Sequence, residues 1–356
     1  MVPLTGTVPV IDLGRRVQRF RPLIDEAIGR VLDRGVYLLG PEVEAFEQEF
    51  AAFTGYQYCV GVASGTEALR LGLTASGIGP GDEVIIPAFT AVPTAAAVCA
   101  AGATPVFVDV ERNTATIDLA AVQRAITDAT KAVIPVHLYG RPSLIPTFDG
   151  VRVLEDGAQA HGAPSHNRSA IGVAYSFYPT KNLGGVGDGG GFVTDDPVLA
   201  EEIRHRRVHG MRDGYVHQEI STNSRTSELE AATLRVFLPS LEADNVRRRE
   251  IAHRYRAAAP LLDWPADHPS HAYHLCVVRV DDRDQFRSEM PFQTAVHYQR
   301  ALTEQPAYAQ YVRDDCPEAE AWAATTVSLP CFAEMTDHEV DFVAEALQNA
   351  EAKWRR

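Results

Sequence analysis

Two ionisable residues near the middle of the chain are placed to do chemistry at a sheet edge. Asp156 follows the apolar run 151–154, and Lys181 follows the apolar run 174–178 and precedes a glycine-rich turn. In an open parallel sheet, ligands bind at the carboxyl ends of the strands. We therefore expect the carboxylate and the amine to face each other there, although a lone lysine is more often an ordinary surface residue.

A third group of residues, Ser64-Gly65-Thr66, lies between a predicted strand that ends at Val62 and a predicted helix that begins near Thr66. The first amides of a helix have no partner within it, and the helix dipole turns its positive end toward them. Gly65 allows the backbone to approach a ligand closely, and the Thr66 hydroxyl can donate to a phosphate oxygen. Taken alone, these residues fit a plain Ser/Thr helix cap equally well.

Together the three features describe a site for pyridoxal phosphate. This cofactor needs a lysine amine for a Schiff base, a carboxylate that keeps its pyridine nitrogen protonated, and a cradle for its phosphate. No metal site is predicted. His205 and His209 have the i, i+4 spacing of zinc ligands, but no glutamate follows His205 as the HExxH motif requires.

Short apolar runs alternate with helical patterns around these residues. The predicted strands are 58–62, 83–87, 104–108, 132–136, 151–154 and 174–178, and helices are predicted to begin near residues 41, 66, 92 and 119. This alternation predicts an α/β fold with a mostly parallel sheet and helices on both of its faces.

The last third of the chain has a different pattern. It contains predicted helices at 228–238, 240–259 and 339–347, and further short elements at 275–280 and 294–298. The run of three arginines at 247–249 is predicted to lie on the charged face of its helix. We predict a large cofactor-binding α/β domain with an N-terminal arm, residues 1–239, and a smaller C-terminal α+β domain, residues 240–356.

Several longer motifs make the sequence similar to a known family. They are Ala63-Ser-Gly-Thr-Glu-Ala-Leu69, Glu155-Asp-Gly-Ala-Gln-Ala-His161, Ser176-Phe-Tyr-Pro-Thr-Lys181, Gly187-Asp-Gly-Gly190 and Asn223-Ser-Arg225. The chain resembles, over nearly its whole length, the DegT/DnrJ/EryC1/StrS family of fold-type-I, pyridoxal-phosphate-dependent sugar aminotransferases. The fold implied is a large domain with a mostly parallel mixed sheet plus a smaller domain.

The resemblance also implies a role for each matched residue. Lys181 is the expected Schiff-base lysine and proton carrier, Asp156 the partner of the pyridine nitrogen, and Gln159 a contact of the ring or its 3-oxygen. The phosphate is expected to be held by Gly65, Thr66 and Ser176.

Two further positions bear on the site. Asn223 resembles an asparagine that reaches the phosphate from a neighbouring subunit, which implies a homodimer with shared active sites. His161 lies in the aspartate motif, where a packed histidine and a catalytic one both remain open.

One position departs from the family pattern. Many relatives carry an aromatic residue over the cofactor ring where this chain has Ala91. Either another group such as Phe89 covers the ring, or the pocket is roomier.

The activity implied is transfer of an amino group from L-glutamate or L-glutamine to a keto sugar carried on a nucleoside diphosphate, in amino-sugar or natural-product biosynthesis. Some relatives have histidine in place of the lysine and perform dehydration, so Lys181 favours transamination. Two alternatives stay open: a ketocyclitol acceptor of an aminocyclitol pathway, and a regulatory protein that binds the cofactor without turnover.

Composition limits the partners. The chain has 356 residues, with 33 lysines and arginines against 47 aspartates and glutamates. The resulting net charge of −14 argues against binding to nucleic acid.

Residues 84–108 are uncharged and long enough for a membrane span. Prolines and Gly102 interrupt them, so we expect strand, helix and strand instead. Five scattered cysteines without a CxxC pair, and no signal peptide, predict a cytoplasmic protein.

Overall fold

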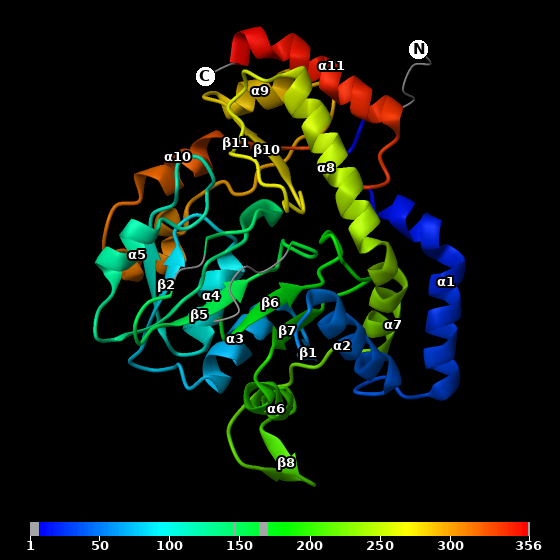
Figure 1. Cartoon of the computed structure of the whole chain (residues 1–356), viewed down its shortest axis with the longest axis vertical. Coiled ribbons are helices and arrows are strands. Elements are labelled where there is room, and N and C mark those ends of the chain that lie inside the picture. Colours follow the sequence, from blue (N-terminus) through cyan, green and yellow to red (C-terminus); the bar gives the residue numbers. More distant parts are fainter. Residues whose placement is uncertain (1–6, 145–146, 164–169, 355–356) are drawn as a thin grey trace.

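The computed structural model describes residues 7–144, 147–163 and 170–354. Its largest element is a seven-stranded sheet with helices on both faces (Figure 1). The strands are β1 (Tyr58–Val62), β2 (Glu83–Pro87), β3 (Thr104–Val108), β4 (Thr130–Val133), β5 (Arg152–Asp156), β6 (Gly172–Ser176) and β7 (Gly190–Thr194). They lie in the order β1-β7-β6-β5-β4-β2-β3, and β7 is antiparallel to both of its neighbours while the other pairs are parallel.

The helices that accompany the sheet come from the first two thirds of the chain. They are α1 (Leu13–Arg34), α2 (Pro41–Thr54), α3 (Gly65–Ala75), α4 (Val92–Ala100), α5 (Leu119–Ala125), α6 (Pro197–Arg206) and α7 (Glu228–Phe237), and a small hairpin of β8 (Met211–Asp213) and β9 (Val216–His217) follows α6. The alternation predicted from the sequence is confirmed, and so is the predicted mostly parallel α/β sheet.

Alternate residues of each strand enter different cores. In β2, Val84 and Ile86 join the core that contains α3, α4 and α6, whereas Ile85 points to the other face and packs with α5. On that second face, Phe46 and Phe50 of α2 pack against the β6, β7 and β1 side of the sheet. Because a strand turns successive side chains to opposite faces, continuous apolar strands of this kind require helices on both sides.

The C-terminal part has a core of its own. The elements of this part are α8 (Leu241–Ala258), β10 (Cys276–Arg279), α9 (Arg283–Glu289), α10 (Pro317–Thr325), β11 (Thr326–Leu329) and α11 (Asp337–Trp354), with β10 antiparallel to β11. Tyr255, Phe286 and Val340 are buried in this core, but Trp322 of α10 is buried in the first one. In Figure 1, α8 extends from α7 to the C-terminal helices. The division at residue 240 stays a prediction.

The C-terminal elements were only partly predicted. The segment 275–280 contains β10, and in the segment 294–298 Ala295 forms an isolated bridge to Ser328. Strand β11, which pairs with β10, was not predicted. Helix α1 was not predicted, although Ile24, Ala27 and Val31 form its buried stripe.

The uncharged stretch 84–108 forms β2, α4 and β3, as expected from its prolines. Among the described residues, no helix has both the length and the apolar composition that crossing a bilayer requires. All five cysteines are free thiols.

Candidate active site

A cavity of about 300 Å³ lies at the carboxyl end of the sheet, where β5 and β6 end and α3 begins. Six of the seven predicted site residues line it: Gly65, Thr66, Asp156, Gln159, Ser176 and Lys181. These residues come from three separate segments. The sheet brings them together because parallel strands deliver their carboxyl ends to one edge.

Lys181 lies in the turn that follows β6. Its amide donates to the Tyr178 carbonyl at 2.8 Å, and its side chain is half-buried in the cavity wall. Burial lowers the pKa of the amine to about 8, and the nearby Asp156 carboxylate opposes that shift. An amine with this pKa can hold or release a proton near neutral pH, which a proton carrier requires.

Asp156 ends β5, and both of its carboxylate oxygens are held. The Thr94 hydroxyl donates to Oδ2 at 2.8 Å, and the Ala158 amide donates to Oδ1 at 3.0 Å. The residue is 5% exposed. Thr94, on α4, is a site residue that the sequence analysis missed. Its only signal is that it follows the carboxyl end of β2, where ligand-facing residues gather.

The N-terminus of α3 forms the second wall. Ser64 caps the helix by accepting from the Glu67 amide at 3.2 Å, which leaves the Gly65 and Thr66 amides beside the cavity. A Cβ on residue 65 would lie 2.7 Å from the Cβ of Ser176, so only glycine permits this approach. Two helical amides, a threonine and a serine converge here, and such a group binds phosphate.

Gln159 is fixed at both ends of its amide. Its Oε1 accepts from the Tyr139 amide at 2.7 Å, and its Nε2 donates to the Tyr298 hydroxyl at 2.8 Å. The side chain therefore presents one face to the cavity in a defined orientation. Tyr139 in turn donates to the His297 carbonyl at 2.5 Å, which connects this wall to the C-terminal part of the chain.

Asn223 lies outside the residues that line the cavity, and its side chain is exposed. Its Oδ1 accepts from Arg225 at 2.8 Å. The adjoining residues are held as well: Thr222 accepts from Arg70 at 2.8 Å, and the Ser224 amide donates to the Arg207 carbonyl at 2.9 Å. A role in a second subunit's site stays a prediction.

Phe89 does not cover the cavity. It is fully buried and packs against Tyr298 and Trp322, with ring centroids 6.3 and 6.1 Å away. Ala91 lines the cavity at the position in question, so the pocket is open there. Tyr178, three residues before Lys181, also lines the cavity and was not singled out from the sequence.

The histidines of interest lie elsewhere. His161 is fully buried against Tyr175 and Phe177, and burial lowers its pKa to about 3, so it packs as a neutral ring. His209 lies beyond the end of α6 with a positive φ of 66°, so His205 and His209 do not lie on one turn of the same helix.

A buried carboxylate supports the glycine segment after Lys181. Glu230 of α7 accepts from the Val186 amide at 3.1 Å, and a Cβ on residue 185 would lie 1.6 Å from its Oε1. Burial raises the pKa of Glu230 to about 7, with Asp188 adding to the shift. Asp188 and Gly189 line the cavity, so Glu230 lies directly behind its wall.

The residues present fit pyridoxal phosphate: an amine of low pKa, a fixed carboxylate and an anion cradle share one cavity. The sheet order and this chemistry are those of the fold-type-I class of pyridoxal-phosphate-dependent enzymes. Comparison with known proteins identifies the chain as an aminotransferase of this class. The family model described as the DegT/DnrJ/EryC1/StrS aminotransferase family matches residues 19–348, and the chain belongs to that family.

Three similar proteins illustrate the relationship. The chain is 44% identical over 347 residues to the dTDP-3-amino-3,4,6-trideoxy-alpha-D-glucose transaminase of Streptomyces venezuelae, covering 92% of this chain and 91% of that protein. It is 39% identical over 363 residues to the UDP-N-acetyl-3-dehydro-alpha-D-glucosamine 3-aminotransferase of Acidithiobacillus ferrooxidans, covering 96% and 97%. The crystal structure of S. venezuelae DesV in complex with a ketimine intermediate matches with a TM-score of 0.93 and 40% identity, covering 98% of this chain and 100% of that one.

Proposed function

We propose that this aminotransferase moves an amino group from L-glutamate or L-glutamine to a keto sugar carried on a nucleoside diphosphate. The observation that carries the proposal is the pairing of Lys181 with Asp156 in one cavity above an anion cradle. Two of the similar proteins are named for amination at C3 of a nucleotide-linked sugar, which supports both the sugar class and that carbon.

Each residue of the cavity has a proposed task. Lys181 binds the cofactor and moves the proton at its Nζ, Asp156 holds a proton on the pyridine nitrogen, and Gln159 orients the ring. Gly65, Thr66 and Ser176 bind the phosphate through amides and hydroxyls. The bound cofactor supplies an electron sink that stabilises negative charge on the substrate carbon.

We further propose a homodimer in which Asn223 of one chain completes the other chain's site. Apolar residues that a lone chain leaves exposed support this assembly. Val36, Tyr37, Leu38 and Leu39 before α2 are each 40–51% exposed, and Tyr215 of the hairpin is 90% exposed. Such surface is expected to be covered in an assembly.

The free thiols support a cytoplasmic location, where cysteines stay reduced.

Replacing the lysine tests the core of the proposal. Lys181→Ala should lower kcat at least ~10⁴-fold, because it removes both the attachment point and the proton carrier. Borohydride reduction of wild type should attach the cofactor to the peptide that contains residue 181, as mass spectrometry would show. Attachment to any other lysine contradicts the assignment.

The acceptor is tested with the enzyme in its pyridoxamine phosphate form. Nucleotide keto sugars should restore the visible absorbance of the lysine-bound cofactor, and ketocyclitols should not. A response to ketocyclitols alone would replace the proposed substrate class, and failure of glutamate and glutamine to convert the enzyme would favour a regulatory protein.

The shared site is tested by mixing two inactive chains. Lys181→Ala and Asn223→Ala chains, denatured and refolded together, should form hybrid dimers with one intact site. Activity should return in the mixture and not in either variant alone. No recovery despite hybrid formation, measured by native mass spectrometry, contradicts the role of Asn223.

A further inference from the structure

A buried arginine outside the cavity binds the segment that carries Lys181. Arg16 lies in the first turns of α1 and is 7% exposed. Its guanidinium donates to the carbonyls of Lys181 at 3.2 Å, Gly184 at 3.3 Å and Pro179 at 3.4 Å. Every hydrogen bond that the structure gives to this guanidinium therefore ends on residues 179–184.

The neighbouring arginines of α1 behave differently. Arg15 forms a two-pronged pair with Glu339 of α11, at 2.7 Å for each bond, and Arg19 bonds to Asp244 of α8 at 2.7 Å. These two fasten the helix to the C-terminal helices, whereas Arg16 points inward. Burial lowers the pKa of Arg16 to about 10, so it still carries its charge at neutral pH.

The geometry suits an arginine in particular. A guanidinium is a planar fork with five N–H donors, so one side chain can bind several carbonyls at once, while a lysine offers a compact point charge. The bound carbonyls bracket residue 181 on both sides. Their position determines how deeply the amine is buried beside Asp156.

We propose that Arg16 is a positioning residue that holds the backbone of Lys181 and thereby keeps its amine in the buried, reactive place in the cavity. This inference rests on the proposed role of Lys181 as the cofactor-binding lysine. Arg16 touches neither the cavity nor a reacting atom, so its effect passes entirely through the 179–184 segment. Release of that segment moves the amine toward water and away from its productive position.

Three variants of the full chain test the proposal. Arg16→Gln removes the charge and most of the donors, and Arg16→Lys keeps the charge but not the fork. Arg19→Gln is the matched control, because Arg19 lies one turn along the same helix and binds Asp244 rather than the lysine segment.

The first measurement is chemical modification of Lys181 in cofactor-free protein. Acetylation by acetic anhydride is followed across pH 6–10 by peptide mass spectrometry. Because burial is what lowers the pKa of this amine, Arg16→Gln should move the midpoint of its pH profile up by about one unit. Arg16→Lys should give a smaller shift, and Arg19→Gln should match wild type.

The second measurement is steady-state kinetics. A misplacement of about 1 Å is expected to lower kcat on the order of 10²-fold, so Arg16→Gln should lower kcat roughly 10- to 100-fold and leave KM for the donor within about threefold. Arg16→Lys should recover part of this loss. If Arg16→Gln does not fold, the same two measurements on Arg16→Lys decide.

Two results would overturn the inference: an unchanged Lys181 profile and kcat in both variants, or a loss of thermal stability alone. Failure of the proposed function looks different. Borohydride would then attach the cofactor to another lysine in wild type, while the acetylation profile would still report whether Arg16 positions residue 181.

Discussion

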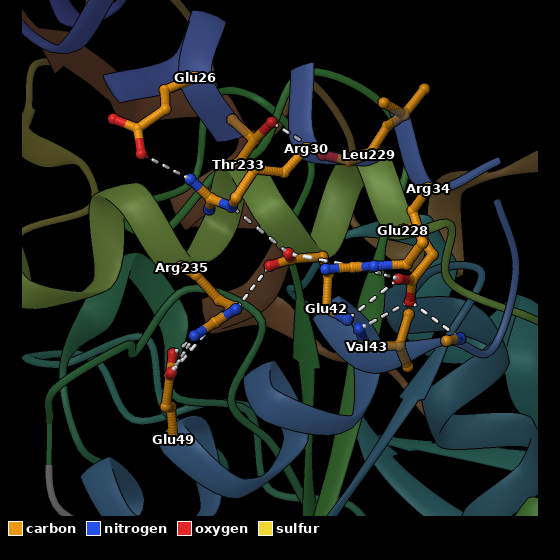
Figure 2. A network of polar contacts seen from close by, with 11 residues as sticks. Glu26, Arg30, Arg34, Glu42, Val43, Glu49, Glu228, Leu229, Thr233 and Arg235 are labelled. Carbon is orange, nitrogen blue, oxygen red and sulfur yellow. Dashed lines mark hydrogen bonds and ion pairs between the residues drawn. The ribbon is translucent and has the colours of Figure 1, made fainter. Parts of the chain in front are cut away.

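Two buried glutamates of α7, Glu228 and Glu230, lie two residues apart and have very different surroundings. Figure 2 shows that Glu228 sits at the start of α2, where it accepts from the amides of Gly40, Glu42 and Val43 at 2.8–3.0 Å. Arg34 lies 3.8 Å from it. Glu230 accepts from the Val186 amide and lies near a second negative charge, Asp188.

Helix α7 therefore serves two purposes. Glu228 is compensated on several sides, so its charge caps α2 and fixes the packing of α1, α2 and α7. Glu230 is buried with little compensation, and burial raises its pKa to about 7. Such uncompensated groups concentrate near functional sites, and this one supports the cavity wall that follows Lys181.

The largest effect is expected from removing the compensated charge. Glu228→Gln should lower the free energy of unfolding by about 4 kcal/mol, because one amide nitrogen would face buried N–H donors and Arg34 would keep only one of its two carboxylate partners, Glu42. Urea denaturation at pH 7 measures this loss. The folded fraction should keep its kcat, and a loss below about 1 kcal/mol would break the comparison.

The next effect depends on pH. The folded chain holds the Glu230 proton more tightly than the unfolded chain, so binding of this proton stabilises the fold. The stabilisation is complete below about pH 4.5 and is lost as the pH rises through about 7. At about 1.4 kcal/mol per unit of pKa shift, the loss is on the order of 3 kcal/mol.

Glu230→Gln sharpens this contrast. The variant should lack that part of the pH dependence, so it should match wild type near pH 5 and be more stable than wild type at pH 8. Urea denaturation from pH 5 to pH 8 measures both chains. Equal slopes against pH would show that Glu230 does not titrate in this range.

The smallest effect is expected at the edge of the Figure 2 network. Arg235 binds Glu42 at 2.5 Å and Glu49 at 2.7 Å, but its side chain is 30% exposed. Glu49 is 41% exposed, and the buried Glu42 keeps Arg30 and Arg34 within 3.8 Å when Arg235 is removed. Arg235→Gln should therefore cost about 1 kcal/mol or less. The difference in free energy of unfolding between wild type and variant should be smaller in 1 M salt than in 0.1 M salt. A loss as large as that of Glu228→Gln would contradict the contrast.

Local sequence patterns predicted much of the site. Asp156 ends an apolar strand, and Gly65 and Thr66 begin a helix after one, so the parallel sheet had to bring them to one edge. The resemblance added Gln159 and Ser176, which also line the cavity. Thr94 was missed because nothing in its neighbours shows that its hydroxyl reaches Asp156.

Side-chain burial was harder to predict than secondary structure. The run 247–249 was expected on a charged helix face, and for Arg248 this is wrong: the residue is 2% exposed and donates to the Cys331 carbonyl at 2.5 Å. Phe89 was a candidate for covering the cofactor, yet it packs with Trp322, which is 233 positions later. Periodicity identifies a helix or strand, but not which distant segment covers it.

Neighbours along the chain were enough to predict the alternation of strands and helices around the sheet, the lysine and the carboxylate that follow strands, and the glycine that admits an anion. That Arg16 binds the lysine segment and that Glu230 stays largely uncompensated could be seen only in the folded chain. Those outcomes depend on the burial of charge by segments far apart in sequence, and the energy of a buried charge is set by whatever surrounds it in space.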